Sequence, residues 1–232
     1  MGFPFYLAMD SMEMEGYNGA QSPAWFSCQF SPVSGGLCDL PRQLPAGSVL
    51  VLDDARPYCH HDPSRIVREL AEAARQFRSA AVVLDFQKPY RQALGTLALE
   101  LENQLPCPVV VTPAYTGCTQ GPVLLPPVPC HIPVEKWITD LTRPIWLEID
   151  NRNLRLTLTE TGLEQSCIQS FPSSGKVHWD KDLCCHYQIR QEHATFILHR
   201  TREDLAALLA RAERFGVQAA IGLYQELRPL LR

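Results

Sequence analysis

The chain has 232 residues, of which 46% are hydrophobic and 20% are charged, and it contains 9 cysteines and 19 prolines. This composition excludes an intrinsically disordered, collagen-like or coiled-coil protein. A chain of this length can bury roughly 70–75% of the surface that its unfolded form exposes. We therefore expect a single domain that spans residues 1–232.

The formal net charge is −4, from 21 Lys and Arg against 25 Asp and Glu, and the basic residues are scattered along the chain. A protein that binds nucleic acid usually carries a basic patch or arm, so we expect no nucleic-acid partner. No apolar run approaches the roughly 20 residues that cross a bilayer, and the first ten residues lack the features of a secretion signal. We expect a cytoplasmic protein without a membrane span.

The cysteines do not indicate a metal centre or a disulfide framework. Their number is odd and none falls in a CxxC pair. Cysteine and histidine lie side by side in three clusters, at residues 59–61, 130–131 and 184–186. Adjacent side chains diverge, so one ion would need two clusters to meet in space. We expect neither a metal nor a cofactor.

Short apolar runs alternate with amphipathic stretches, the pattern of a parallel sheet wrapped by helices. We expect strands at Phe5–Met9, Ala24–Phe30, Ser48–Asp53, Ala80–Phe86, Val109–Thr112, Cys130–Pro133, Ile145–Ile149 and Ala219–Tyr224. We expect helices from Asp62 to Phe77, from Arg91 to Asn103, from Val134 to Leu141 and from Thr201 to Phe215. Asp62 followed by proline, and Thr201 followed by Asp204, are typical helix starts.

Three segments depart from this alternation. Ser31–Gly47 and Pro113–Pro129 are rich in proline, glycine or serine, and we expect irregular loops there. After Asp150 the hydrophobic period becomes two, which predicts antiparallel strands at Leu154–Thr159, Tyr187–Arg190 and Thr195–His199, with a short helix near Leu163–Ser170. The predicted fold is a short, partly irregular TIM-type (β/α) barrel, with an α+β insertion at residues 151–200 before the last strand.

Polar residues, most of them carboxylates, close several of the predicted strands. In an α/β barrel the ligand lies at the carboxyl ends of the strands, so these residues are the candidates for a site. The strand-end residues are Asp10, Asp53, Asp54, Asp85, Gln87, Glu148, Asp150, Tyr224, Gln225 and Glu226. Alternation predicts that Asp85 and Gln87 point to the same face.

The run Ser79–Pro89 resembles the fourth-strand signature of glycoside hydrolase family 18, in which apolar residues lead to an Asp-aromatic-Glu-x-Pro ending. The segment 178–224 is similar to the C-terminal part of that family, with an inserted antiparallel unit, a capped helix and the closing strand. The resemblance implies a chitinase-like barrel, and it covers most of residues 50–87 and 176–227.

The differences from the family bear on activity. Ala80, Val83 and Gln87 stand where the family carries acids, and of the series only Asp85 remains. Gln87 occupies the place of the glutamic acid that protonates the glycosidic oxygen, and an amide cannot donate that proton. The tyrosine–aspartate pair of the sixth strand has no counterpart near residues 130–133. The tryptophan of the last strand is replaced by the region of Tyr224 and Gln225.

The resemblance therefore implies a catalytically inactive, family 18-like protein that binds a carbohydrate or serves as a scaffold. Its partner would be an oligosaccharide of the N-acetylglucosamine type or a protein, and the family's bacterial relatives favour a bacterial source. The predicted ligand contacts are Asp10, Asp54, Asp85, Gln87, Tyr115, Glu148, Tyr224 and Gln225, with Trp146 as a further aromatic platform. The alternative is an active glycosidase that uses Asp54, Asp85 and Glu148, which would require two carboxyl groups about 5–9 Å apart.

Overall fold

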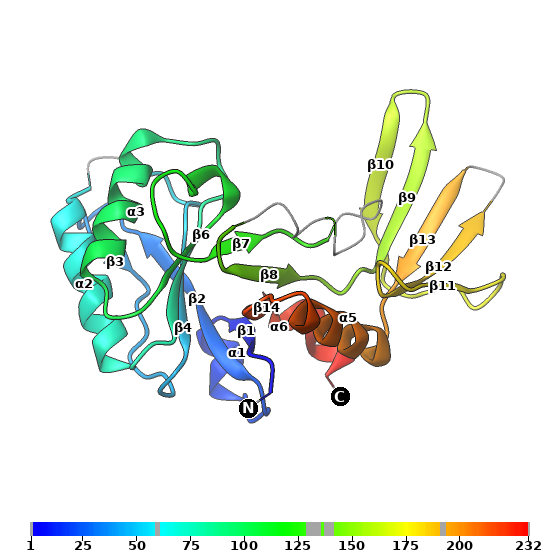
Figure 1. The fold of residues 1–232 in the computed structure, drawn as a ribbon, viewed down its shortest axis with the longest axis horizontal. Coiled ribbons are helices and arrows are strands. Elements are labelled where there is room, and N and C mark those ends of the chain that lie inside the picture. The colour runs from blue at the N-terminus through cyan, green and yellow to red at the C-terminus, as the bar shows by residue number, and fades with distance from the viewer. Residues whose placement is uncertain (1, 59–60, 129–135, 137–141, 191–193, 232) are drawn as a thin grey trace.

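Eight parallel strands close into a barrel in the computed structural model of the chain, which describes residues 2–58, 61–128, 136, 142–190 and 194–231. The pairing of the first two strands closes the sheet. In their order around the barrel, the strands are β1 (Phe5–Met9), β2 (Ser22–Phe30), β4 (Val49–Asp53), β5 (Ala81–Asp85), β6 (Val109–Val111), β7 (Val123–Leu125), β8 (Ile145–Ile149) and β14 (Ala219–Leu223). Figure 1 shows the strands with their covering helices.

Side chains alternate between the inside and the outside of this barrel. The inward cluster contains small and branched residues, among them Ala24, Val51 and Val83, together with the larger Trp146 and Ile221. Filled interiors of this kind are typical of (β/α) barrels. The outward side chains pack under helices, which explains why most of the strands are apolar on both faces.

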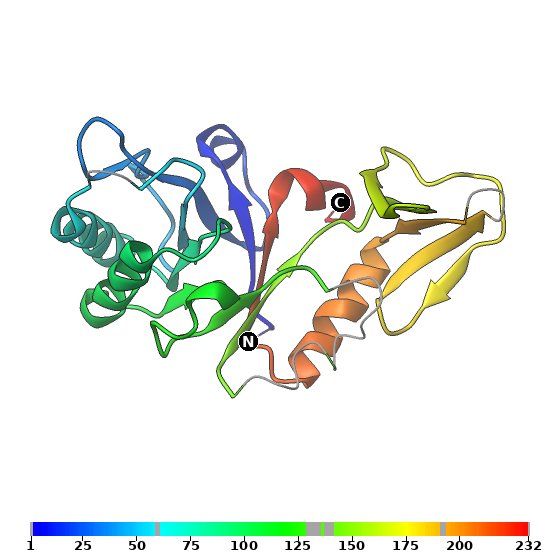
Figure 2. The same ribbon diagram turned by 90° about the horizontal axis from the view of Figure 1, so that it is seen from above.

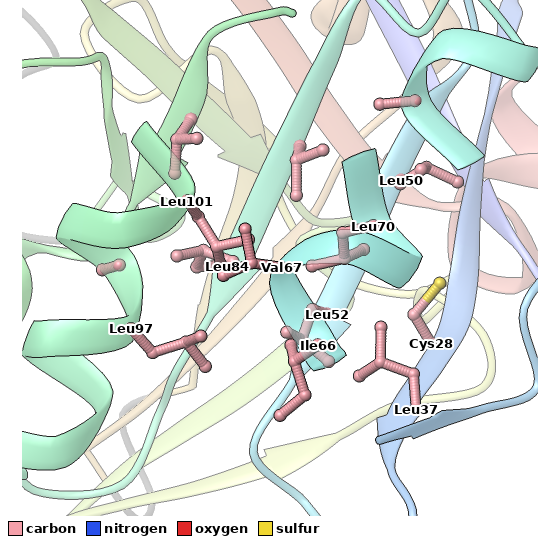
Figure 3. Close-up of a cluster of buried hydrophobic side chains, with 14 of the residues drawn as sticks. Cys28, Leu37, Leu50, Leu52, Ile66, Val67, Leu70, Leu84, Leu97 and Leu101 are labelled. Carbon is pink, nitrogen blue, oxygen red and sulfur yellow. The ribbon is translucent and has the colours of Figure 1, made fainter. Parts of the chain in front are cut away.

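Among the described residues, three long helices cover the outside of the barrel, namely α2 (Pro63–Gln76), α3 (Gln92–Gln104) and α5 (Arg202–Arg214). In Figure 2, α2 and α3 lie together on one side and α5 lies on the other. Figure 3 shows how α2 and α3 bury side chains such as Leu70 and Leu101 against Leu52 and Leu84 of the sheet. The Asp62 carboxylate caps α2 by accepting hydrogen bonds from the N–H groups of the next turn, as its sequence predicts.

The first two connections of the barrel carry no long helix. Between β1 and β2 there is only α1 (Ser11–Glu15), and between β2 and β4 there is the two-residue strand β3 (Leu37–Cys38), followed by an irregular segment, residues 39–48. The described residues also contain the short elements α6 (Tyr224–Leu227) and the 3-10 turns η1 (Pro113–Tyr115) and η3 (Arg228–Leu230). The irregular connection agrees with the prediction for Ser31–Gly47.

The residues between β8 and α5 in the chain form a separate antiparallel sheet, within the predicted insertion. Its strands are β9 (Leu154–Thr159), β10 (Gly162–Cys167), β11 (His178–Asp180), β12 (Cys185–Arg190) and β13 (Thr195–His199). They follow the order β10-β9-β13-β12-β11. The prediction of a barrel with an antiparallel insertion before the last strand is confirmed.

The helix predicted near Leu163–Ser170 is wrong. This stretch begins with β10, which pairs with β9 in register from Gly162 opposite Thr159 to Cys167 opposite Leu154. Gly162 has a φ of +135°, a conformation that favours glycine, so the chain can reverse within a tight turn. The hairpin therefore overrides the weak helical pattern of the segment.

The position predicted for the sixth barrel strand was also wrong. The sixth strand is β7, in the middle of the segment that was expected to be a loop. It has only three residues and follows Pro122, so it is too short to give the longer apolar run from which a strand is predicted. Residues 130–133 lie outside the described residues, and so does the helix predicted at 134–141, apart from Lys136. Of the helices in the described ranges, none is long and apolar enough to span a membrane.

Candidate functional site

The carboxyl end of the barrel brings three carboxylates together, and we call this end the barrel mouth. Asp53 of β4 and Asp85 of β5 occupy paired positions in the register of the two strands. Asp85 and Glu148 both line a cavity of about 30 Å³ inside the mouth. Its other lining residues are apolar or glycine: Ala8, Phe26, Val51, Val83, Leu124, Ile221, Gly222 and Leu223. The cavity has room for roughly one or two waters and none for a sugar ring.

Burial raises the pKa of both carboxyl groups in the cavity. The pKa of Glu148 is raised to about 7 by burial and then by the charges of Asp85, Asp150 and Glu226. Burial also raises the pKa of Asp85, and the charges of Asp53 and Asp54 add to this effect, while the hydrogen bond from Gln87 opposes it. The mouth therefore holds two carboxyl groups in surroundings that disfavour their charged forms.

Gln87 lies at the exposed rim of the mouth. Its side-chain amide donates a hydrogen bond to the Asp85 carboxylate, so the two side chains do point to the same side of the chain. The side chain of Asp54, which is only 5% exposed, holds the turn that carries Gln87. The Asp54 carboxylate accepts hydrogen bonds from the backbone N–H of Gln87 at 3.0 Å and of Lys88 at 3.1 Å.

Asp54 therefore holds a turn, and it is absent from the lining of the cavity. The residue beside Asp85 is Asp53, which was among the strand-end candidates but not among the predicted ligand contacts. Its carboxylate accepts hydrogen bonds from the Gln29 amide at 3.2 Å and from the Ala55 N–H at 2.8 Å. The alternation of Val49, Val51 and Asp53 on the inward face was the sequence signal that could have identified it.

Two aromatic residues that were predicted to face a ligand lie in the core. Tyr115 is 1% exposed, and its ring packs against Phe86 at a centroid distance of 5.3 Å. Trp146 is 6% exposed and stacks on Tyr6 inside the barrel, with centroids 5.3 Å apart. Neither ring presents a face to solvent, because both pack against other aromatic rings.

The other predicted contacts lie at the ends of β1 and β14. Asp10 caps α1, since its carboxylate accepts a hydrogen bond from the N–H of Glu13 at 2.9 Å. Tyr224 is half-buried and meets Tyr17 edge to face at 5.5 Å between centroids. Gln225 is exposed in the first turn of α6. None of the three residues lines the small cavity.

The predicted cysteine and histidine clusters form no metal site among the residues that are described. No group of three or more His, Cys, Asp or Glu side chains there could hold an ion. Cys59, His60, Cys130 and His131 lie outside the described residues. In the third cluster, His186 contacts Asp204 through Nδ1 at 2.6 Å, and Cys185 is fully buried.

No family model matches the sequence, and neither does any curated protein. Solved structures do match the fold. The family 18 chitinase from Cycas revoluta in complex with allosamidin superposes with a TM-score of 0.63 over 98% of this chain and 97% of that chain, at 9% identity. The chain has the fold of a family 18 chitinase.

Two further chitinase-like folds give similar values. The Bacillus cereus spore cortex-lytic enzyme SleL matches 98% of this chain and 73% of its own chain, with a TM-score of 0.61 and 9% identity. The chitinase from Chromobacterium violaceum matches 95% and 93%, with a TM-score of 0.61 and 8% identity. In this chitinase-like barrel β5 is the fourth strand, as the sequence resemblance implies, and Gln87 follows it by two residues.

Proposed function

We propose that the protein is a noncatalytic member of the chitinase-like barrels and that it binds an oligosaccharide of the N-acetylglucosamine type at the barrel mouth. The observation that carries the proposal is the hydrogen bond from the Gln87 amide to Asp85 at the rim. A glycosidase of this kind needs a carboxylic acid that protonates the leaving oxygen. An amide of the same size can contact a sugar and cannot protonate it.

Glu148 is a poor substitute for the missing acid, although its pKa of about 7 would suit a proton donor. It lies on β8 and lines a cavity of only about 30 Å³, where a sugar ring has no room. Removal of a general acid lowers the rate by about a hundred- to ten-thousand-fold. The arrangement therefore favours binding over hydrolysis.

Carbohydrate binding is supported by the groups that remain accessible at the rim. Gln87 and Gln225 are exposed, Tyr224 is half-buried, and amide and hydroxyl groups match the donors and acceptors of a sugar. Similar folds include the Cycas revoluta chitinase in complex with (GlcNAc)3. A sugar would lie across these groups, above the small cavity.

A scaffold role is the second candidate, and the small volume of the cavity favours it. A barrel mouth that side chains fill presents little concave surface to a ligand. In that case the protein would act through a protein partner. The active glycosidase with Asp54, Asp85 and Glu148 is less well supported, because Asp54 is engaged with the backbone of residues 87 and 88.

Titration calorimetry with the trisaccharide of N-acetylglucosamine tests the proposal. We expect the wild type to bind and Gln87→Ala to bind at least about fivefold more weakly, the effect of one lost hydrogen bond. Gln165→Ala, on the exposed strand β10, is the matched control and should bind like the wild type. Absence of binding by the wild type would overturn the carbohydrate proposal and leave the scaffold role.

A further inference from the structure

A large cavity lies outside the barrel, over the outer side of β2. It has a volume of about 1220 Å³ and is bounded by α1, the turn at residues 16–21, β2 and the segment 39–46. We call it the outer groove. It follows β2 from Ser22 to Gln29, a length of about 23 Å at the usual rise per residue.

The outer groove exists because two connections of the barrel lack their helices. The long helices of the described residues lie over β4 to β6 and beside β8 and β14, whereas β1 and β2 have the five-residue α1 beside them and β1 also contacts the four-residue α6 (Figure 2). Gly16 ends α1, and the prolines and glycines of residues 31–47 prevent a helix in the next connection. Part of the outer face of β2 is thereby left to solvent.

The groove offers apolar surface along one side. Trp25 and Pro23 of β2 line it, together with the partly buried Met14, Leu40 and Leu44. The indole N–H of Trp25 donates to the carbonyl of Asp39 at 2.8 Å, which fixes the ring against the segment 39–46. A ligand with an apolar face would find a rigid surface here.

Uncharged polar groups line the same groove and have no partner in the described chain. The side chains of Ser22, Ser27 and Gln43 take part in none of the hydrogen bonds recorded for the described residues. Together they present two hydroxyls and an amide as donors and acceptors. A purely apolar ligand would leave these groups unsatisfied.

The charges of the groove give a polyanion no net attraction. Glu15 and Asp39 are balanced by Arg42 and by Arg56, which lies 3.9 Å from the Asp39 carboxylate. An extended peptide is disfavoured for a different reason. β2 is paired with β1 on one side and with β4 on the other, so that no strand edge is free to bind a peptide backbone over Ala24 and Trp25.

We propose that the outer groove is a second binding site, separate from the barrel mouth, for a linear uncharged oligosaccharide. Such a ligand combines an apolar ring face for the partly buried Leu40 and Leu44 with hydroxyls for Ser22, Ser27 and Gln43. The volume and length suit a chain of several sugar units better than a single ring. The site does not depend on what the barrel mouth binds.

The test uses the 15N-labelled full chain and three neutral trisaccharides, namely those of N-acetylglucosamine, β-1,4-linked glucose and α-1,4-linked glucose. We expect at least one of them to shift the NMR signals of the Trp25 indole N–H and the Gln43 side-chain amide in a saturable way. Gln43→Ala should weaken this binding about fivefold, and Ser22→Arg, which fills the groove, should abolish it. Gln165→Ala on β10 should bind like the wild type.

Binding at the mouth is distinguished by Gln87→Ala, which should leave the shifts at Trp25 and Gln43 unchanged. A heparin tetrasaccharide should not shift them. The proposal is overturned if no neutral trisaccharide shifts these signals at its solubility limit, if all shifts are lost in Gln87→Ala, or if the anionic sugar binds more tightly.

Discussion

The guanidinium of Arg200 donates a hydrogen bond to the carboxylate of Asp150 over 3.1 Å. Asp150 follows β8 of the barrel, and Arg200 follows β13 of the antiparallel sheet, so that this pair ties the two sheets together. Arg200 is 1% exposed, and its other donors reach the carbonyls of Asp150, Leu183 and Cys184. A buried guanidinium with this many partners fixes how the insertion joins the barrel.

Arg200→Met is expected to destabilise the protein by about 3 kcal/mol, because it removes one partner of a buried pair and leaves several carbonyl groups without a donor. The free energy of unfolding in urea measures the effect. Arg155→Met, on the exposed side of β9, is the control and should change stability by less than about 0.5 kcal/mol. Equal stability of the two variants would contradict the role of Arg200.

Asp204 joins the insertion to α5. Its carboxylate contacts Nδ1 of His186 at 2.6 Å, accepts from the Trp179 indole N–H at 2.8 Å and from the Thr201 N–H at 2.9 Å. Burial alone would raise the pKa of Asp204, but these hydrogen bonds outweigh it and lower the pKa.

Because the folded-state pKa of Asp204 lies below the unfolded value, its stabilising effect is fully present above about pH 4 and is lost as the pH falls through the folded-state pKa. We expect Asp204→Asn to be less stable than the wild type at neutral pH, with a difference that shrinks in acid. Unfolding curves between pH 7 and pH 2 measure this difference. A difference independent of pH would show that the charge of Asp204 has no part in it.

The contribution of Glu148 to stability has the opposite dependence on pH. Its pKa is raised from 4.5 to about 7, so the folded state disfavours its charge, and stability is lost as the pH rises from about 4.5 to above 7. Glu148→Gln removes this charge and is expected to be more stable than the wild type by about 2–3 kcal/mol at pH 8, and similar to it at pH 4. Thermal unfolding at both pH values would detect the change, and a less stable variant at pH 8 would contradict it.

Gly222 allows β14 to approach β8 closely. A Cβ atom at this position would lie 2.5 Å from the carbonyl oxygen of Ile149 and 2.5 Å from Cδ1 of Leu227. Gly222→Ala should therefore destabilise the barrel by about 1–3 kcal/mol. Gly117→Ala, where a Cβ meets no atom within 4 Å, is the control in the same urea experiment. If both variants unfold at the same urea concentration, the close approach is not required.

The parts of the fold that the sequence predicts well are those with strong local signals. β4, α2 and β5 combine strands that are apolar on both faces with a helix that starts at Asp62 and Pro63. β7 escaped prediction because three apolar residues between prolines are too few for a periodic signal. β10 escaped because its pairing with β9 across the tight turn decides its conformation, and its own residues carry no hydrophobic period of two.

The site was predicted less completely than the fold. The burial of its side chains and their convergence at the barrel mouth depend on the closed barrel. Strand alternation correctly placed Asp85 and Gln87 on the same side, where they share a hydrogen bond. It could not tell that Tyr115 would be sealed under Phe86 and Tyr90. Asp54 was named as a contact in place of Asp53, although the alternation of Val49, Val51 and Asp53 along β4 places Asp53 on the inward face.

The most direct test of the central claim is the hydrolysis of N-acetylglucosamine oligomers by the purified wild type, with Gln87→Glu alongside it. An amide at this position supplies no proton to the leaving sugar, so we expect the wild type to release no product above the rate without protein. Turnover by the wild type that disappears in Glu148→Gln would show an active glycosidase and contradict the account.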